Sequence, residues 1–115
     1  MSDATIASGW ELPPGLPAAA QDCPLEQAIN TVGGRWKMLV LRALFLGGGQ
    51  RFNDLLRAVQ GISAKELTRN LRELEYAGLV DRRDGEQLYV LSALGETMLP
   101  VFRELGALGA RLRAR

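Results

Sequence analysis

The side chains best suited to bind a partner lie in one short segment, residues 63–72. This segment combines long basic groups with short hydroxyls: Ser63, Lys65, Thr68, Arg69 and Arg72. Groups of these two kinds hydrogen-bond to the edges of DNA bases and to the phosphates beside them. We therefore expect base or near-base contacts from the first two turns of a helix here, at Ala64, Lys65, Thr68 and Arg69, and a phosphate contact from Arg72. Ser63 is a further candidate for contact with DNA.

The same segment also carries an apolar stripe at helical spacing, formed by Leu67, Leu71 and Leu74. An amphipathic helix buries such a stripe and exposes the residues off it. A second interpretation of the basic residues stays open at this point. They could form an ordinary solvated face, with Arg69–Glu73 and Arg72–Glu75 as local ion pairs.

The chain has few of the side chains that enzymatic catalysis uses. There is a single cysteine, Cys23, and no histidine. An internal disulfide, a Cys–His or Ser–His–Asp nucleophile and the usual zinc ligand sets are therefore excluded. Gly47-Gly48-Gly49 follows an apolar helical run and lacks the Lys-Ser/Thr of a phosphate-binding loop. We expect no enzyme, no metal and no cofactor.

The distribution of charge is more informative than the formal net charge of +1. Residues 1–34 hold four acidic and no basic side chains, whereas residues 35–83 hold ten basic and five acidic ones. The basic excess is thus concentrated in the middle of the chain, as contact with phosphates requires. The remaining residues, 84–115, are balanced.

Capping and stop residues divide this middle region into helices. Pro24 suits the first turn of a helix that begins after Asp22 or Cys23 and ends at Gly33-Gly34. A second helix spans 36–46, a brief strand lies at 51–52, and a third helix at 54–59 follows Asn53 as its cap. Ser63 and Glu66 form a capping box for a fourth helix that ends before Gly78.

The pattern changes to alternation over residues 79–91, which predicts a β-hairpin. Asp84-Gly85 is a preferred two-residue turn. It would pair Arg83 with Glu86 and Val80 with Tyr89. Two helices joined by a three-residue turn and followed by a hairpin define a winged helix-turn-helix. We expect Arg83, in the wing, to contact a phosphate or the minor groove, although Asp84 and Glu86 flank it and the Arg83–Glu86 pair is an alternative.

The two ends of the chain, outside the winged helix-turn-helix, differ in character: the amino-terminal segment shows no regular pattern, and the carboxyl-terminal segment is strongly amphipathic. Residues 1–22 are rich in Pro, Ala and Gly, and we expect a weakly structured arm whose Trp10 and Leu12 either dock on a partner subunit or stay free. Residues 23–115 form the domain. After Ser92 an apolar stripe continues to Leu112, interrupted by Pro100, which should kink or split the helix. So long a stripe predicts a homodimer.

Several motifs, in order and at matching spacing, resemble the HxlR-type winged-helix regulators, which are relatives of the MarR group. The resemblance covers about residues 23–109 and rests on these segments: Cys23-Pro24-Leu25-Glu26, Gly33-Gly34-Arg35-Trp36-Lys37, Arg51-Phe52-Asn53-Asp54-Leu55, Gly61 to Thr68, Leu71 to Glu75, and Gly78-Leu79-Val80. It implies a DNA-binding homodimer whose first and last helices build the interface. The family's recognition pattern falls on Ser63, Lys65, Thr68 and Arg69 here.

The chain departs from the family at the wing, whose tip is shorter than usual and lacks a proline. The closing Ser92-x-x-Gly95 matches the family's usual Thr-x-x-Gly. Some family members sense oxidants or electrophiles through the cysteine equivalent to Cys23. A helix amino terminus favours the thiolate, which is the reactive form. The other interpretation of Cys23 is a small capping residue without a redox role.

Together these observations predict a mainly α-helical chain with a small antiparallel hairpin: a winged helix-turn-helix with additional terminal dimerisation helices. Its expected function is sequence-specific regulation of transcription on a pseudo-palindromic site, with double-stranded DNA and a second copy of itself as partners. A small-molecule or oxidant effector is a further expectation. We expect neither signal peptide nor membrane span, and a cytoplasmic location. The alternatives are a sensor of an apolar molecule held near Trp36 and Phe102, and a winged helix that binds only proteins.

Overall fold

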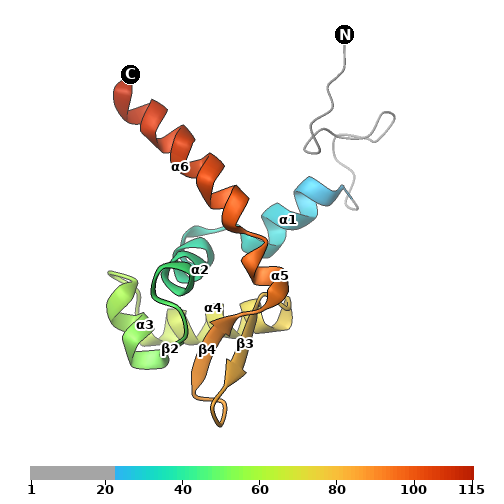
Figure 1. Ribbon diagram of the computed structural model, residues 1–115, viewed down its shortest axis with the longest axis vertical. Helices are drawn as coiled ribbons and strands as arrows, with labels where there is room; N and C mark the ends of the chain where they lie inside the picture. Colours follow the sequence, from blue (N-terminus) through green and yellow to red (C-terminus); the bar gives the residue numbers. More distant parts are fainter. Residues whose placement is uncertain (1–22) are drawn as a thin grey trace. The chain divides into compact units, whose positions relative to one another are not determined.

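The structure is a computed structural model that describes residues 23–115 (Figure 1). The chain divides into two compact units, one ending at Gly33 and the other spanning Gly34–Arg115, and each is described by itself. The expected arm at 1–22, with Trp10 and Leu12, lies outside the described residues. Within residues 23–115, no helix is both long enough and apolar enough to span a membrane.

The first unit contributes α1 (Pro24–Val32), which begins and ends where the sequence predicts. Pro24 occupies its first turn and Cys23 its N-cap position, although the Cys23 side chain makes no capping hydrogen bond. The helix ends at Gly33, whose N–H donates to the carbonyl of Ile29 at 2.7 Å. Its apolar side chains remain accessible: Leu25 is 49% and Ile29 56% exposed.

Three helices form the centre of the second unit: α2 (Arg35–Gly47), α3 (Phe52–Ala58) and α4 (Ala64–Tyr76). Their apolar stripes meet in a small core. Its fully buried large side chains come mainly from these helices: Val40, Leu41, Leu55, Val59, Leu67, Leu71, Leu74 and Val80. Gly61, at φ 89°, lies in the turn between α3 and α4, where its backbone conformation suits glycine.

The third helix begins earlier than the sequence predicts. It starts at Phe52, not Asp54, so Asn53 lies inside the helix and is not its cap. The Asp54 carboxylate instead accepts a hydrogen bond from the backbone N–H of Arg51 at 3.4 Å. An acidic side chain that reaches back in this way stabilises an earlier helix start. The preceding strand, β2 (Gln50–Arg51), therefore ends one residue sooner than expected.

Two strands that follow α4 join the earlier strand β2 in a three-stranded antiparallel sheet. Strands β3 (Val80–Arg83) and β4 (Leu88–Leu91) form the predicted hairpin, and β2 pairs with the other side of β4. The predicted register is wrong: Val80 pairs with Leu91 and Arg83 with Leu88, so Arg83 does not face Glu86. The connection is a four-residue loop, Asp84–Gln87, in which Asp84 and Glu86 both adopt positive φ.

The chain closes with a short helix, α5 (Ala93–Glu96), and a long one, α6 (Leu99–Ala114). Pro100 lies in the first turn of α6, which confirms the predicted split. Ser92 caps α5 by accepting from the N–H of Gly95 at 3.0 Å and anchors it by donating to the carbonyl of Gly78 at 2.6 Å. A side chain at position 95 would collide with the carbonyl of Leu79, which explains the glycine of the Ser-x-x-Gly motif.

The observed architecture confirms the predicted fold class, a winged helix-turn-helix with additional helices. Figure 1 shows the β3–β4 hairpin beside α4, and α6 extending away from the helix-turn-helix. One edge-to-face contact, Phe45 against Phe102 with ring centroids 5.2 Å apart, packs α2 against α6. Beyond that contact much of the apolar side of α6 is accessible to solvent.

Candidate nucleic-acid interface

The predicted recognition residues share one exposed face of α4. The opposite face is buried through Leu67, Leu71, Leu74 and Asn70. The exposed face forms a shallow hollow of about 470 Å³, lined by Lys65, Thr68, Arg69, Arg72 and Glu73. Four of the residues predicted from the sequence are thus brought together. Ser63 and Ala64, also exposed, lie at the amino end of the same helix.

The start of α4 is fixed by the predicted capping box. Ser63 Oγ accepts from the N–H of Glu66 at 3.0 Å, and Glu66 Oε1 accepts from the N–H of Ser63 at 3.0 Å. These reciprocal bonds satisfy two backbone donors that a helix start leaves unpaired. The first turn of the helix is therefore well defined, and Ala64 and Lys65 leave it toward solvent.

The hydroxyl of Thr68 is partly used within the helix. It donates to the carbonyl of Ala64 at 2.9 Å. A hydroxyl has one donor and two acceptor positions, so its lone pairs remain available to a base amino group or a water. Thr68 is thus oriented as an acceptor on this face.

The carboxylates of α4 are held by other elements. Glu66 Oε2 accepts from the indole N–H of Trp36 at 3.2 Å, and Glu73 pairs with Lys37 at 2.5 Å. Glu75 pairs with Arg82 of β3 at 2.7 Å. The local ion pairs Arg69–Glu73 and Arg72–Glu75 therefore do not form, while the basic side chains are exposed, as they would also be on a solvated face.

The cations of the face are held in no ion pair by the residues that the structure describes, although Arg69, after the larger effects of Ser63 and Lys37, also lowers the pKa of Glu66 and of Glu73 through its charge. Among residues 23–115, Lys65, Arg69 and Arg72 make no ion pair within 4 Å. Basic side chains that are held by no partner can contact phosphates or bases without first breaking an existing bond. Such availability favours contact with a polyanion such as DNA.

Two of the engaged carboxyls are ionised at neutral pH. The backbone N–H of Ser63, followed by its hydroxyl and the Trp36 indole, lowers the pKa of Glu66 below its ordinary value of 4.5. The hydrogen bond and the charge of Lys37 lower the pKa of Glu73 in the same direction. Each therefore attracts its partner most strongly when it is deprotonated.

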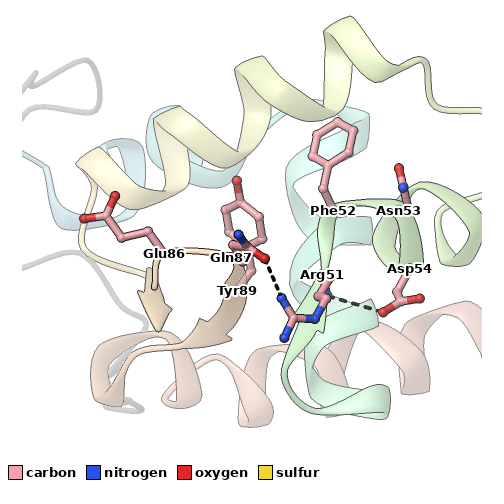
Figure 2. Close-up of a pocket in the computed structure, with 7 residues that line it drawn as sticks. All are labelled: Arg51, Phe52, Asn53, Asp54, Glu86, Gln87 and Tyr89. Carbon is pink, nitrogen blue, oxygen red and sulfur yellow. Dashed lines mark hydrogen bonds between the residues drawn. The ribbon is translucent and has the colours of Figure 1, made fainter. Parts of the chain in front are cut away.

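The wing, which is the β3–β4 hairpin, is bonded to other elements both near its base and at its tip. Arg82, besides its bond to Glu75, lies over the ring of Tyr89 at 5.6 Å. At the tip, Arg51 of β2 pairs with Asp84 at 2.6 Å and donates to Gln87 Oε1 at 3.0 Å. Figure 2 shows Arg51 between Gln87 and Asp54, beside a hollow of about 520 Å³ that Tyr89 also lines.

Arg83, the residue predicted to contact DNA from the wing, is exposed at the end of β3. It lines a different hollow, of about 630 Å³, together with Gly48, Gly49 and Glu96. Arg83 is thus not among the residues that line the hollow beside Arg51. The sequence did not predict the contacts of Arg51, Trp36 and Lys37, because each of these residues bonds to a partner more than 29 residues away.

The two aromatic residues considered for an apolar ligand do not share a site. Trp36 contacts Glu66 at the start of α4, whereas Phe102 packs against Phe45 near the other end of α2. Nine residues of helix separate Trp36 from Phe45, which is about 13 Å of rise. The structure gives no support to a ligand held between Trp36 and Phe102.

Cys23 precedes α1 in the first unit. Its side chain is 3% exposed, and its carbonyl accepts from the N–H of Gln27 at 2.9 Å. It is a free thiol. Within residues 23–115 no group of three His, Cys, Asp or Glu side chains is placed to hold a metal ion.

Comparison with known proteins agrees with this geometry. Residues 31–115 match a protein family described as HxlR-like helix-turn-helix. An uncharacterized HTH-type transcriptional regulator of Methanothermobacter thermautotrophicus is 38% identical over 72% of this chain, which spans 66% of that relative's length. Residues 23–30, including Cys23, precede the part that the family matches.

Solved structures also resemble this chain. Quinone-bound YodB from B. subtilis has a TM-score of 0.69 and 31% identity, over 76% of this chain and 96% of its own. The redox regulator HypR in its reduced form has a TM-score of 0.70 and 32% identity, over 78% of this chain and 93% of its own.

Proposed function

The chain belongs to the HxlR-like helix-turn-helix family of transcriptional regulators, which are not enzymes, and from that premise we propose that it is a homodimer that recognises a specific DNA sequence through α4. The observation that supports this most strongly is the exposed face of Lys65, Thr68, Arg69 and Arg72. Its neighbouring carboxylates are engaged by Trp36, Lys37 and Arg82 instead of by these cations.

In this proposal the amino end of α4 enters the major groove. Ser63 and Ala64 approach the groove first, and Lys65, Thr68 and Arg69 reach base edges from the next turn. Arg72 lies one turn further along and binds a phosphate. Arg83 contacts the flanking backbone from the wing. Such a regulator acts where the chromosome lies, so we place it in the cytoplasm.

A second copy of the chain is the partner proposed for α6. Four large apolar residues of this helix are between 43% and 51% exposed: Val101, Leu105, Leu108 and Leu112. Burial of such side chains stabilises an interface by about 25 cal/mol per Å². A twofold dimer would present two recognition helices about 34 Å apart, one DNA turn, to a pseudo-palindromic site.

The test of the recognition face compares two arginine-to-alanine variants. Fragments that the wild-type protein selects from genomic DNA are compared with random duplexes of equal length. Arg69→Ala should reduce the preference for selected DNA by about 5- to 150-fold, or about 1–3 kcal/mol for a lost base contact. Arg103→Ala, an exposed arginine on α6, is the matched control and should leave the preference unchanged. An Arg69→Ala protein with wild-type preference would show that the recognition face is misplaced.

We also propose that an oxidant or electrophile regulates the protein through Cys23. YodB, solved with a bound quinone, and HypR, solved in reduced and oxidised forms, support this by similarity. A quinone would react by addition of the Cys23 sulfur to a ring carbon. The thiol proton and the displaced ring proton then end on the two quinone oxygens, giving a hydroquinone thioether.

This second proposal predicts that quinone treatment changes DNA binding by the wild-type protein and adds the mass of one quinone to each chain. Cys23→Ser should show neither change, because it lacks the only thiol. An equal response of the two proteins would contradict a sensing role. Because Cys23 is 3% exposed, the reaction should be slow and should accelerate under mild denaturant.

A further inference from the structure

Two adjacent residues in the first turn of α2 each hold a carboxylate of α4. Trp36 donates to Glu66, and Lys37 pairs with Glu73. The two glutamates lie seven residues apart, which is two helical turns or about 10 Å along the axis. α2 therefore contacts the recognition helix at two separated points through directional bonds.

Glu66 joins the two helices through a single carboxylate. Its Oε1 closes the capping box with Ser63, while its Oε2 accepts from the Trp36 indole at 3.2 Å. The group that defines the first turn of α4 is thus itself bonded to α2. A shift of the Trp36 ring would therefore act on the same carboxylate that caps the recognition helix.

The surroundings restrict both donors. The Arg35 guanidinium lies 4.5 Å from the centre of the Trp36 ring, in the range of a cation–π contact. The Lys37 side chain is 17% exposed, so its ammonium is partly shielded from competing water. Its partner Glu73 is 48% exposed, so this ion pair lies at the surface with only the lysine side partly shielded.

The apolar core does not by itself fix the direction of α4. Leu67, Leu71 and Leu74 hold the helix against the core, but apolar contact is non-directional. Two polar anchors two turns apart add directional contacts that resist tilting and axial sliding of the helix. Base recognition needs side chains held within about 0.5 Å of their productive positions by supporting contacts.

We infer that Trp36 and Lys37 are positioning residues for DNA recognition, which orient α4 through Glu66 and Glu73. The inference rests on the proposed DNA-binding function. The inference predicts that loss of these two contacts weakens sequence-specific binding and not non-specific binding. Loss of the anchors leaves the charges of Lys65, Arg69 and Arg72 in place, so non-specific binding persists, but the side chains no longer meet base edges in register.

The DNA arm of the test uses Trp36→Phe, which removes the indole N–H and keeps an aromatic ring, and Lys37→Met, which removes the charge and keeps the aliphatic stem. Both should lose at least about tenfold in preference for selected over random duplex, comparable to a mismatched base pair. Affinity for random duplex and its dependence on salt should stay at wild-type values. Glu104→Gln, on the exposed side of α6, is a neutral control. A wild-type preference in both variants would overturn the inference.

A second arm needs no DNA. In the free protein, the indole ¹H–¹⁵N resonance of Trp36 should shift as the Glu66 carboxyl titrates, and Glu66→Gln should abolish that shift. Trp36→Phe identifies the resonance, since Trp10 is the only other tryptophan. An indole chemical shift that stays constant while the Glu66 carboxyl titrates would overturn the inference. Failure of the proposed function would look different. The wild-type protein would then bind no duplex, while the indole resonance of Trp36 would still shift as the Glu66 carboxyl titrates.

Discussion

Individual carboxylates decide which cations of α4 remain available. The helix carries three acidic and three basic side chains in residues 64–76, so its own charge predicts no affinity for DNA. The partners make the difference. Trp36, Lys37 and Arg82 engage Glu66, Glu73 and Glu75, and the basic residues are left facing solvent. The pairing of single residues thus turns a neutral helix into a basic surface.

The state of Glu66 gives a prediction about pH. Its pKa is lowered in the folded protein, so its contribution to stability is fully present above its ordinary pKa of 4.5 and is lost as the pH falls through the lower folded pKa. Glu66→Gln should therefore be less stable than wild type at pH 7. Their urea midpoints should converge as the pH falls below 4.5.

The control for this prediction is Glu104→Gln, which should follow the wild-type curve at every pH. Glu73 contributes to the wild-type acid response in the same direction, because Lys37 lowers its pKa too. The difference between wild type and Glu66→Gln isolates the first carboxyl. A difference that stays constant from pH 7 into the acid range would contradict the ionised bridge between Trp36 and Ser63.

The contacts that could be predicted from the sequence are those between residues close together in the chain. Ser63 and Glu66 lie three positions apart, and their capping box follows from spacing alone. The Trp36–Glu66 bond joins residues 30 positions apart, and no periodicity encodes it. For the same reason the local pairs Arg69–Glu73 and Arg72–Glu75 were credible from sequence, although both acids bind residues from other elements.

At the scale of elements, local signals placed most boundaries. The start of α4 is marked by Ser63, and its end by Gly78, the residue after the C-cap. The split between α5 and α6 is marked by Pro100. Each of these residues acts on the backbone beside it. The hairpin register was predicted wrongly for a physical reason. The observed register shifts β4 by two residues, and a shift of two returns every side chain to the same face. Hydrophobic alternation therefore cannot distinguish the two registers.

Tertiary bonds select the register that forms. Arg51 reaches both Asp84 and Gln87, and β2 pairs with β4 on the side away from β3. A two-residue turn would withdraw Asp84 and Gln87 from these positions. The pairs Arg51–Asp84 and Arg51–Gln87 span more than 30 residues and carry no signature in the sequence.

The acidic tip of the wing gives a prediction at this scale. Asp84→Asn removes a negative charge and releases Arg51, while asparagine tolerates the positive φ of 57° at this position. If the wing lies near the DNA backbone, affinity for random duplex should rise several-fold and its salt dependence should steepen. Fluorescence anisotropy over a salt series measures both quantities.

Asp84→Asn is best compared with Glu104→Gln, which removes one negative charge far along the chain, on α6. An equal rise in the two variants would reflect net charge alone. Unchanged affinity in Asp84→Asn would show that the wing does not approach the DNA. The positions of Arg83 and of the tip would then serve the fold and not recognition.

At the scale of the whole molecule, the sequence predicted the fold and an excess of apolar surface on the last helix. The stripe was too long for so small a core to cover, and in the structure Leu105, Leu108 and Leu112 remain accessible. In the proposed homodimer a second chain covers them, and no pattern within one chain can position that second chain. The proposed dimer supplies that cover and also sets the spacing of the two recognition helices.

The most direct test is a hydroxyl-radical footprint of the wild-type protein on a duplex selected from genomic DNA. A homodimer that reads DNA through α4 predicts two protected half-sites with approximate twofold symmetry, centred about 34 Å apart, and protection that weakens steeply as salt rises. A duplex left unprotected at low salt, or a single protected segment without a symmetric counterpart, would contradict the account.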